Sequence, residues 1–189
     1  DIDPELFYEV EGSVQHDLYE AAPNHVIANA VTELDTDDAV YVLEDLDEED
    51  RAEILEHLPQ GDRAAIEEGL SYPEDSAGRL MQRDLVSLPE FWTIGQTIDF
   101  LRSEKENLPE EFYDLFVIDP AHRLVGTIPL SRVMRSKRHE RIGDIMDTDV
   151  RRVNVLADQE DVAYEFSKYH LISAPVVDAS ERVVGVVTV

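Results

Sequence analysis

The pattern of apolar and polar positions changes about a third of the way along the chain. In the first part a unit of twelve residues repeats as 35–46, 47–58 and 59–70, with a looser copy at 23–34. Each unit opens with acidic, Pro or Gly residues suited to a helix N-terminus and then places Ala, an aliphatic residue and Leu at helical spacing. Each unit therefore predicts one short helix. Helices this short cannot bury their faces alone, which predicts a superhelical array of helical hairpins.

From about Leu80 onward, short apolar strands alternate with helices, and the pattern is duplicated. Residues 116–130 (FVIDPAHRLVGTIPL) align with residues 175–189 (PVVDASERVVGVVTV), with Asp, Arg, Val and Gly in register. Each copy reads as a strand, a tight turn carrying Asp, and a second strand. In that strand Gly126 or Gly185 would let backbones approach closely.

Further matching segments precede each strand pair. Amphipathic helices are predicted at 94–103 and 159–169, and upstream of them stand the related pairs 80–81 (Leu-Met) and 145–146 (Ile-Met). The duplicated unit is thus strand, helix, strand, strand. The whole chain reads as an α+β multidomain protein, with an all-α superhelical part followed by two βαββα-type units.

The net charge of the chain argues against some classes of binding partner. The chain has 43 Asp and Glu against 16 Lys and Arg, a formal net charge of −27, which repels phosphate backbones and argues against nucleic acid. It has no cysteine, so a metal ion would be held by oxygen or imidazole ligands. Cations are the natural counterpart of such a surface. Only three of the basic residues are lysines, however, and an acidic, lysine-poor surface also suits solubility in salt.

Two other classes of protein find little support. No segment approaches the roughly 18–20 apolar residues of a membrane-spanning helix, so we expect this stretch to be soluble by itself. A glycine-rich phosphate loop, a His-Glu-x-x-His motif and a nucleophile elbow are all missing from the sequence, and its carboxylates lie mostly at helix starts. We therefore do not expect an enzyme.

Two motifs carry a family resemblance. The Pro-Val-Val-Asp strand, its turn and the Val-Gly-Val-Val-Thr strand resemble the CBS domain, which normally works in pairs. The junction Tyr-Pro-Glu-Asp-Ser-Ala-Gly-Arg-Leu-Met at 72–81, placed between helical repeats and a CBS pair, resembles the MgtE-type magnesium transporters. The resemblance covers nearly the whole chain. It implies an N domain at 1–77, a first CBS domain at 78–141 and a second at 142–189, the outer two incomplete at their far ends.

The resemblance also implies a function. It points to a homodimeric region on the cytoplasmic side of the inner membrane, in which acidic residues of the N domain and the CBS pair share regulatory Mg²⁺ ions. Bound Mg²⁺ would hold the domains together and close the transmembrane pore domain of the same full-length chain.

Candidate magnesium ligands follow from the family's motif. They are Asp37, Gly78, Asp158, Glu160 and Ser167, the glycine and serine through their backbone. Three of them also have a structural interpretation, because Asp158 can cap a helix, Asp37 can favour a helix N-terminus, and Gly78 can mark a turn.

Two positions depart from the family's pattern. Tyr41 and His170 stand where the family can carry acids, which would weaken magnesium binding. His170 could contact an ion's water or prefer a transition metal, but we expect a half-buried structural role for it.

Adenine nucleotides, ATP or AMP, are the main alternative ligand, since many CBS pairs bind them between the copies. The Ser/Thr-x-x-Asp pattern that holds the ribose in such domains is missing from residues 128–132 (IPLSR), which weakens this alternative. A basic stretch at 132–141 could face anionic lipid, a phosphate-bearing ligand or acids of the dimer partner. A metal-independent scaffold for protein interactions also stays open.

Overall fold

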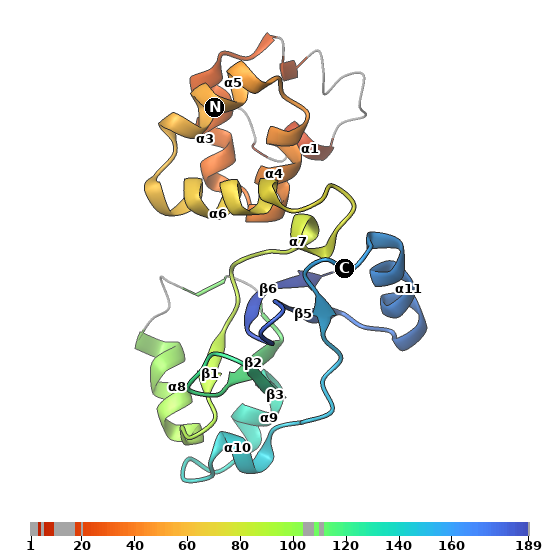
Figure 1. Cartoon of the computed structure of the whole chain (residues 1–189). Coiled ribbons are helices and arrows are strands. Elements are labelled where there is room, and N and C mark those ends of the chain that lie inside the picture. Colours follow the sequence, from red (N-terminus) through yellow and green to blue (C-terminus); the bar gives the residue numbers. More distant parts are fainter. Residues whose placement is uncertain are drawn as a thin grey trace.

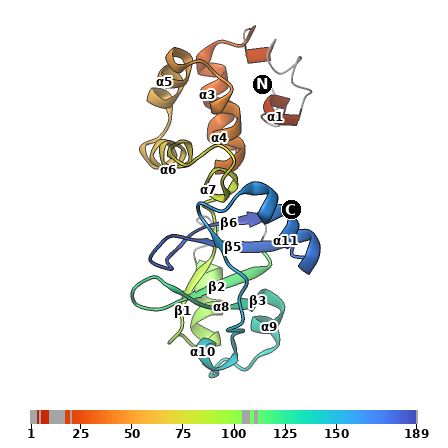
Figure 2. The ribbon, with the colours of Figure 1, turned by 45° about the vertical axis from the view of Figure 1, so that its right-hand side comes forward.

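The structure is a computed structural model that describes residues 4, 6–9, 18–19, 21–103, 108–109 and 112–188. A helical N domain lies at one end and two small αβ units lie at the other, with the short helix α7 (Ala77–Leu80) between them (Figures 1 and 2). None of the described helices is long and apolar enough to cross a membrane.

The twelve-residue repeat corresponds to helices, one to a unit. After α1 (Leu6–Glu9), the N domain contains α3 (Asn24–Glu33), α4 (Thr36–Glu44), α5 (Glu48–His57) and α6 (Gln60–Ser71). These four helices begin at residues 24, 36, 48 and 60, which confirms the predicted period. Asp47 caps α5 by accepting hydrogen bonds from the backbone N–H groups of Glu49 and Asp50.

The prediction that consecutive helices pack against each other as hairpins was wrong. Helices two apart along the chain pack most closely, α3 with α5 and α4 with α6. The reason lies in the connections: Leu34 and Leu58 leave their helices in extended conformations, with ψ of 155° and 151°. Each following helix therefore starts at an angle to the last one, and the shared core forms between alternate helices. Val40, Leu43, Ile54 and Ile66 are buried in that core.

The two αβ units have the predicted order of elements. The first contains β1 (Ser87–Pro89), α8 (Ile94–Ser103), β2 (Asp114–Ile118), β3 (Leu124–Pro129) and α9 (Leu130–Arg135), and α10 (Ile142–Ile145) follows. The second contains β4 (Val153–Asn154), α11 (Gln159–Tyr169), β5 (Ser173–Val177) and β6 (Val183–Thr188). In each sheet the first strand runs parallel to the middle strand, and the third runs antiparallel to it.

The aligned Asp and Arg residues build the same turn twice. Asp119 accepts hydrogen bonds from the backbone of Ala121 and Arg123 and pairs with the Arg123 side chain at 2.7 Å. Asp178 does the same for Ser180 and Arg182, with an ion pair of 2.8 Å. Their matching positions in the two copies are therefore explained by turn geometry rather than by a ligand.

The segment that precedes each unit in sequence packs against the third strand of the other unit. We call these segments, at 81–82 and 146–147, the lead-ins. The sulfur of Met146, which precedes the second unit, would lie 2.5 Å from a Cβ placed on Gly126 of the first. The sulfur of Met81, which precedes the first unit, would lie 2.6 Å from a Cβ on Gly185 of the second. Reciprocal backbone hydrogen bonds accompany the exchange, Asp147 with Thr127 and Gln82 with Val186. Only glycine leaves room for this approach.

Candidate metal and ligand sites

Asp37 lies in the first turn of α4 and is the most unusual carboxylate of the N domain. One of its oxygens, Oδ1, is buried and has no hydrogen-bond partner among the described residues. Burial, reinforced by the charges of Asp38 and Asp35, raises the pKa of Asp37 to about 7. A buried carboxylate oxygen without a donor is costly in water-free surroundings, and a bound cation would relieve it.

Acidic residues face one another where the N domain meets the CBS pair. Asp84, which follows α7, has its pKa raised mainly by burial and further by the charges of Asp35 and Asp62 from the N domain. No three potential ligand side chains converge on one point within the described ranges. The interface is therefore an acidic surface that would offer one or two carboxylates to an ion, enough for Mg²⁺ with retained waters.

Gly78 and the residues around Asp158 are brought together. The backbone N–H of Gly78 donates to the carbonyl of Val155 at 2.8 Å, and Ser76 forms a β-bridge with Asp158. A Cβ on Gly78 would lie 2.6 Å from the ring of Tyr72 and 2.8 Å from Val155. Gly78 lies within α7 rather than at a turn, and close packing requires a glycine there, because a larger residue would push these segments apart.

Asp158 acts as a helix cap, as the alternative interpretation predicted. Its Oδ1 accepts a hydrogen bond of 2.8 Å from the backbone N–H of Glu160 at the start of α11. Both side chains are exposed. Ser167 lies seven residues after Glu160 on the same helix, a rise of roughly 10 Å. Ser167 therefore cannot share one inner-sphere Mg²⁺ with Asp158 or Glu160 of the same protomer, and no described contact joins Asp37 to these three.

The helix end at Ser167 and His170 is better defined. His170 adopts a left-handed conformation with φ of 52° and caps α11, and both its N–H and that of Leu171 donate to the carbonyl of Phe166. His170 is exposed, so the expected half-buried role was wrong. The Ser167 carbonyl receives neither of these two N–H groups. Tyr41, the other departure, is also exposed, at 45%.

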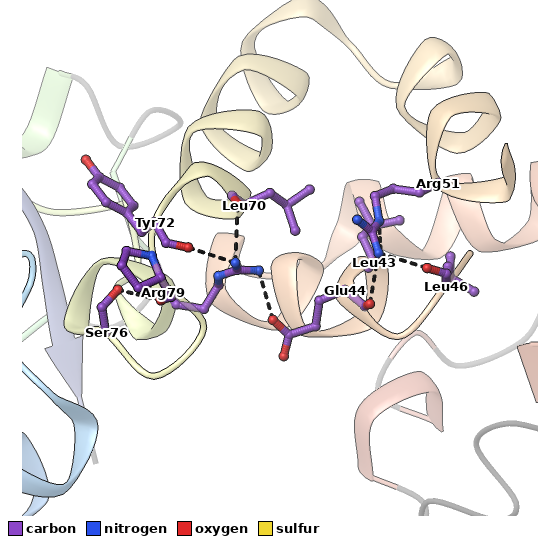
Figure 3. Close-up of polar contacts among 9 residues, drawn as sticks. Leu43, Glu44, Leu46, Arg51, Leu70, Tyr72, Ser76 and Arg79 are labelled. Atoms are coloured by element: carbon purple, nitrogen blue, oxygen red, sulfur yellow. Dashed lines mark hydrogen bonds and ion pairs between the residues drawn. The ribbon is translucent and has the colours of Figure 1, made fainter. Parts of the chain in front are cut away.

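An arginine missed by the sequence analysis links the N domain to the CBS pair (Figure 3). Arg79 of α7 pairs with Glu44 of α4 at 2.9 Å and donates to the carbonyls of Leu70 and Tyr72 at 3.2 and 2.8 Å. Its side chain is only 10% exposed. The signal was present, since Arg79 is the only basic residue of the 72–81 junction.

Two neighbouring contacts extend this link. Arg83 pairs with Glu68 of α6 at 2.7 Å, and its hydrogen bond lowers the pKa of Glu68. Gln82 approaches Asp35 at 3.4 Å. The segment 79–83 therefore attracts the N domain through two arginines, and this attraction opposes the repulsion among the acids.

A cleft of about 550 Å³ opens between the two αβ units. It is lined by the start of β2, by β3, by residues 146–151 after α10, and by the approach to β5. Its size fits a small molecule. Asp114, Asp147 and Asp149 line it together with a single cation, Arg151.

The architecture and the junction agree with known proteins. Residues 1–75 match the family described as the MgtE intracellular N domain, and residues 77–139 and 142–189 match the CBS domain. The chain belongs to the MgtE family. It is 35% identical over 160 residues to a protein named magnesium transporter MgtE from Bacillus subtilis (strain 168), covering 85% of this chain and 35% of that protein.

Other MgtE relatives give the same picture. The protein of that name from Thermus thermophilus is 36% identical over 118 residues, covering 62% of this chain and 26% of that protein. A crystal structure described as the cytosolic domain of the Mg²⁺ channel MgtE in complex with ATP superposes with a TM-score of 0.89 at 29% identity, covering 98% of this chain and 75% of that one. The chain thus spans about a third or less of the curated MgtE proteins it matches.

Proposed function

We propose that this chain is the magnesium-sensing regulatory region of a magnesium transporter. The MgtE relatives are named as magnesium transporters or as the cytosolic domain of a Mg²⁺ channel, which supports a place on the cytoplasmic side of the membrane next to a pore domain. The observation that carries the proposal is the buried, unpartnered Oδ1 of Asp37, two residues from Asp35, whose charge raises the pKa of Asp84 across the acidic interface between the N domain and the CBS pair.

The sensing step follows from the charges at that interface. Asp35 and Asp62 of the N domain raise the pKa of Asp84 on the other side, so these groups disfavour one another's ionised forms. Asp37, with Asp84 or the backbone near Gly78, would hold Mg²⁺ and remove that repulsion. Asp158, Glu160 and the Ser167 carbonyl would hold further ions on the second CBS unit. Occupied sites favour the closed arrangement of the domains, and a shift of this kind would gate the attached pore.

Small-angle scattering tests the proposal directly. The radius of gyration is measured in chelator and in millimolar MgCl₂, with NaCl matched for ionic strength. We expect compaction that is specific to the divalent ion and that Asp37→Asn reduces. Asp45→Asn, which removes the same charge at the exposed far end of α4, is the control and should respond like the parent. Identical curves in all salts would refute sensing and favour a metal-independent scaffold or mere solubility in salt.

We also propose that the CBS pair forms a homodimer. Large apolar side chains of this part are exposed in the single chain, among them Leu156, Tyr164 and Ile172 at 64%, 60% and 63%. Burial of such side chains between two copies would stabilise a dimer. Sedimentation equilibrium should give twice the chain mass, and Tyr164→Glu should lower that mass toward one chain. A monomer at all concentrations would rule the dimer out.

A further inference from the structure

A basic surface lies on the first CBS unit of this acidic chain. Five of the 16 Lys and Arg residues fall within residues 132–141, which run from α9 to the residue before α10, and only one acid, Glu140, accompanies them. Residues 1–77 hold only two of the 16, Arg51 and Arg63. Helices α9 and α10 lie at the end of the molecule away from the N domain (Figures 1 and 2). Positive charge is therefore concentrated at the end opposite the most acidic domain.

Three of the five cations are available to a partner. Arg132 pairs with Asp147 at 3.0 Å, and Arg138 pairs with Asp99 at 2.7 Å. The side chains of the other three are exposed and form no ion pair or hydrogen bond with any residue that the structure describes: Arg135, Lys137 and Arg141.

The backbone that carries these cations is tied to the rest of the unit. The N–H of Gly95, in α8, donates to the carbonyl of Arg138 at 2.8 Å, and the N–H of Ile142 donates to the carbonyl of Trp92 at 2.9 Å. The positions of the cations are therefore set by the fold of the first CBS unit.

Two large apolar side chains are exposed beside the free cations. Met134, 63% exposed, precedes Arg135 on α9. Phe91, 61% exposed, lies two residues before Thr93, which forms a β-bridge with Arg141. We call this set of residues the basic-apolar patch: Phe91, Met134, Arg135, Lys137 and Arg141.

Such a combination suits the surface of an anionic bilayer. Lys and Arg attract acidic headgroups, and exposed Phe or Met side chains enter the boundary between headgroups and acyl chains. The negative charge of the N domain opposes this contact little, because salt screens charges beyond about 8 Å at physiological ionic strength. We propose that the basic-apolar patch docks this region on the anionic headgroups of a lipid bilayer. The proposed function enters only by placing a membrane nearby.

Binding of the whole chain to vesicles in chelator and low salt tests the proposal. We expect at least tenfold stronger binding to phosphatidylglycerol vesicles than to phosphatidylcholine vesicles, with the difference lost in high salt. Energy transfer from Trp92, the single tryptophan of the chain, to dansyl-labelled lipid measures the binding next to Phe91. Equal binding to both kinds of vesicle, or no binding to phosphatidylglycerol at millimolar lipid, would overturn the proposal.

Matched variants assign the binding to the patch. Arg135→Glu replaces an attraction by a repulsion and should weaken binding to phosphatidylglycerol at least tenfold. Arg63→Glu makes the same change in the N domain, where the side chain is 43% exposed, and should bind like the parent. Phe91→Ser should weaken binding at least threefold. Circular dichroism would check that all three variants fold.

Two results would exclude the patch as the lipid contact. Equal weakening by Arg135→Glu and Arg63→Glu would show that only net charge matters. A lower mass of Arg135→Glu than of the parent in sedimentation without lipid would assign the patch to a second copy of the chain. Because Mg²⁺ is absent throughout, neither result bears on magnesium sensing.

Discussion

Replacing Asp37 by Asn should stabilise the metal-free protein at neutral and alkaline pH. The pKa of Asp37 moves from 3.8 to about 7 on folding, mainly through burial. A shift of that size corresponds to at most about 4 kcal/mol of folding free energy. Asn has nearly the same shape and no charge, so it removes this penalty. The lost charge at the N-terminus of α4 costs only about 0.3–1 kcal/mol, so the gain should dominate.

The pH dependence gives the sign of the effect. Below pH 4, Asp37 is protonated in both the folded and unfolded states, so the variant and the parent should be nearly equal. Between pH 4 and 7 the unfolded chain releases the proton while the folded chain keeps it, so the stability of the parent falls relative to the variant. Above pH 7 the difference should be constant and at its largest.

The assay is urea unfolding of both proteins in chelator at several pH values from 4 to 8. The difference in unfolding free energy between variant and parent cancels the contributions of the other acids, and the control Asp45→Asn, at an exposed residue, should show a much smaller difference at pH 8. Saturating Mg²⁺ at pH 8 should stabilise the parent more than Asp37→Asn. A difference that does not change with pH, or that favours the parent at pH 8, would refute the burial argument.

Three further changes probe other features. Gly185→Ala places a Cβ 2.6 Å from Met81 and should lower the free energy of unfolding in urea by about 1–3 kcal/mol. The control Gly61→Ala, with no atom within 4 Å of its Cβ, should be neutral or stabilising, and equal effects of the two changes would contradict the exchange of lead-ins. Arg79→Met leaves Glu44 and two carbonyls without their donor, so we expect a loss of about 2–4 kcal/mol and faster proteolysis after residue 70, and an unchanged melting temperature would argue against the link. Asp158→Asn keeps a good helix cap, whereas Asp158→Ala should lose about 0.5–2 kcal/mol of stability. If Asp158 binds Mg²⁺, both variants should be stabilised less by Mg²⁺ than the parent, and a full magnesium response in Asp158→Asn would show that Asp158 only caps the helix.

Local features were well predicted from the sequence. The helices at 94–103 and 159–169 and the twelve-residue period were confirmed, because apolar spacing reports directly on which face of an element is buried. The Asp158 cap was also predictable, since it joins residues two apart.

Features that depend on partners distant in sequence were not predicted. Periodicity cannot say that the lead-in of one CBS unit packs on the other, or that Arg79 reaches Glu44 across 35 residues. The acidic cleft depends on the irregular segment 147–151, which belongs to no helix or strand. For the same reason the magnesium residues remain predictions: their positions in the fold are known, but ion binding depends on groups brought together from distant parts of the sequence rather than on any local pattern.

The exchange of lead-ins determines the route by which a signal can travel. Residues 79–83 form ion pairs with the N domain. They belong in sequence to the first CBS unit but pack on β6 of the second. A displacement of the second unit, which carries Asp158 and Glu160, would therefore reach the N domain without passing through the core of the first. The first unit can then respond to a different signal, so the two copies of one fold can have separate regulatory roles.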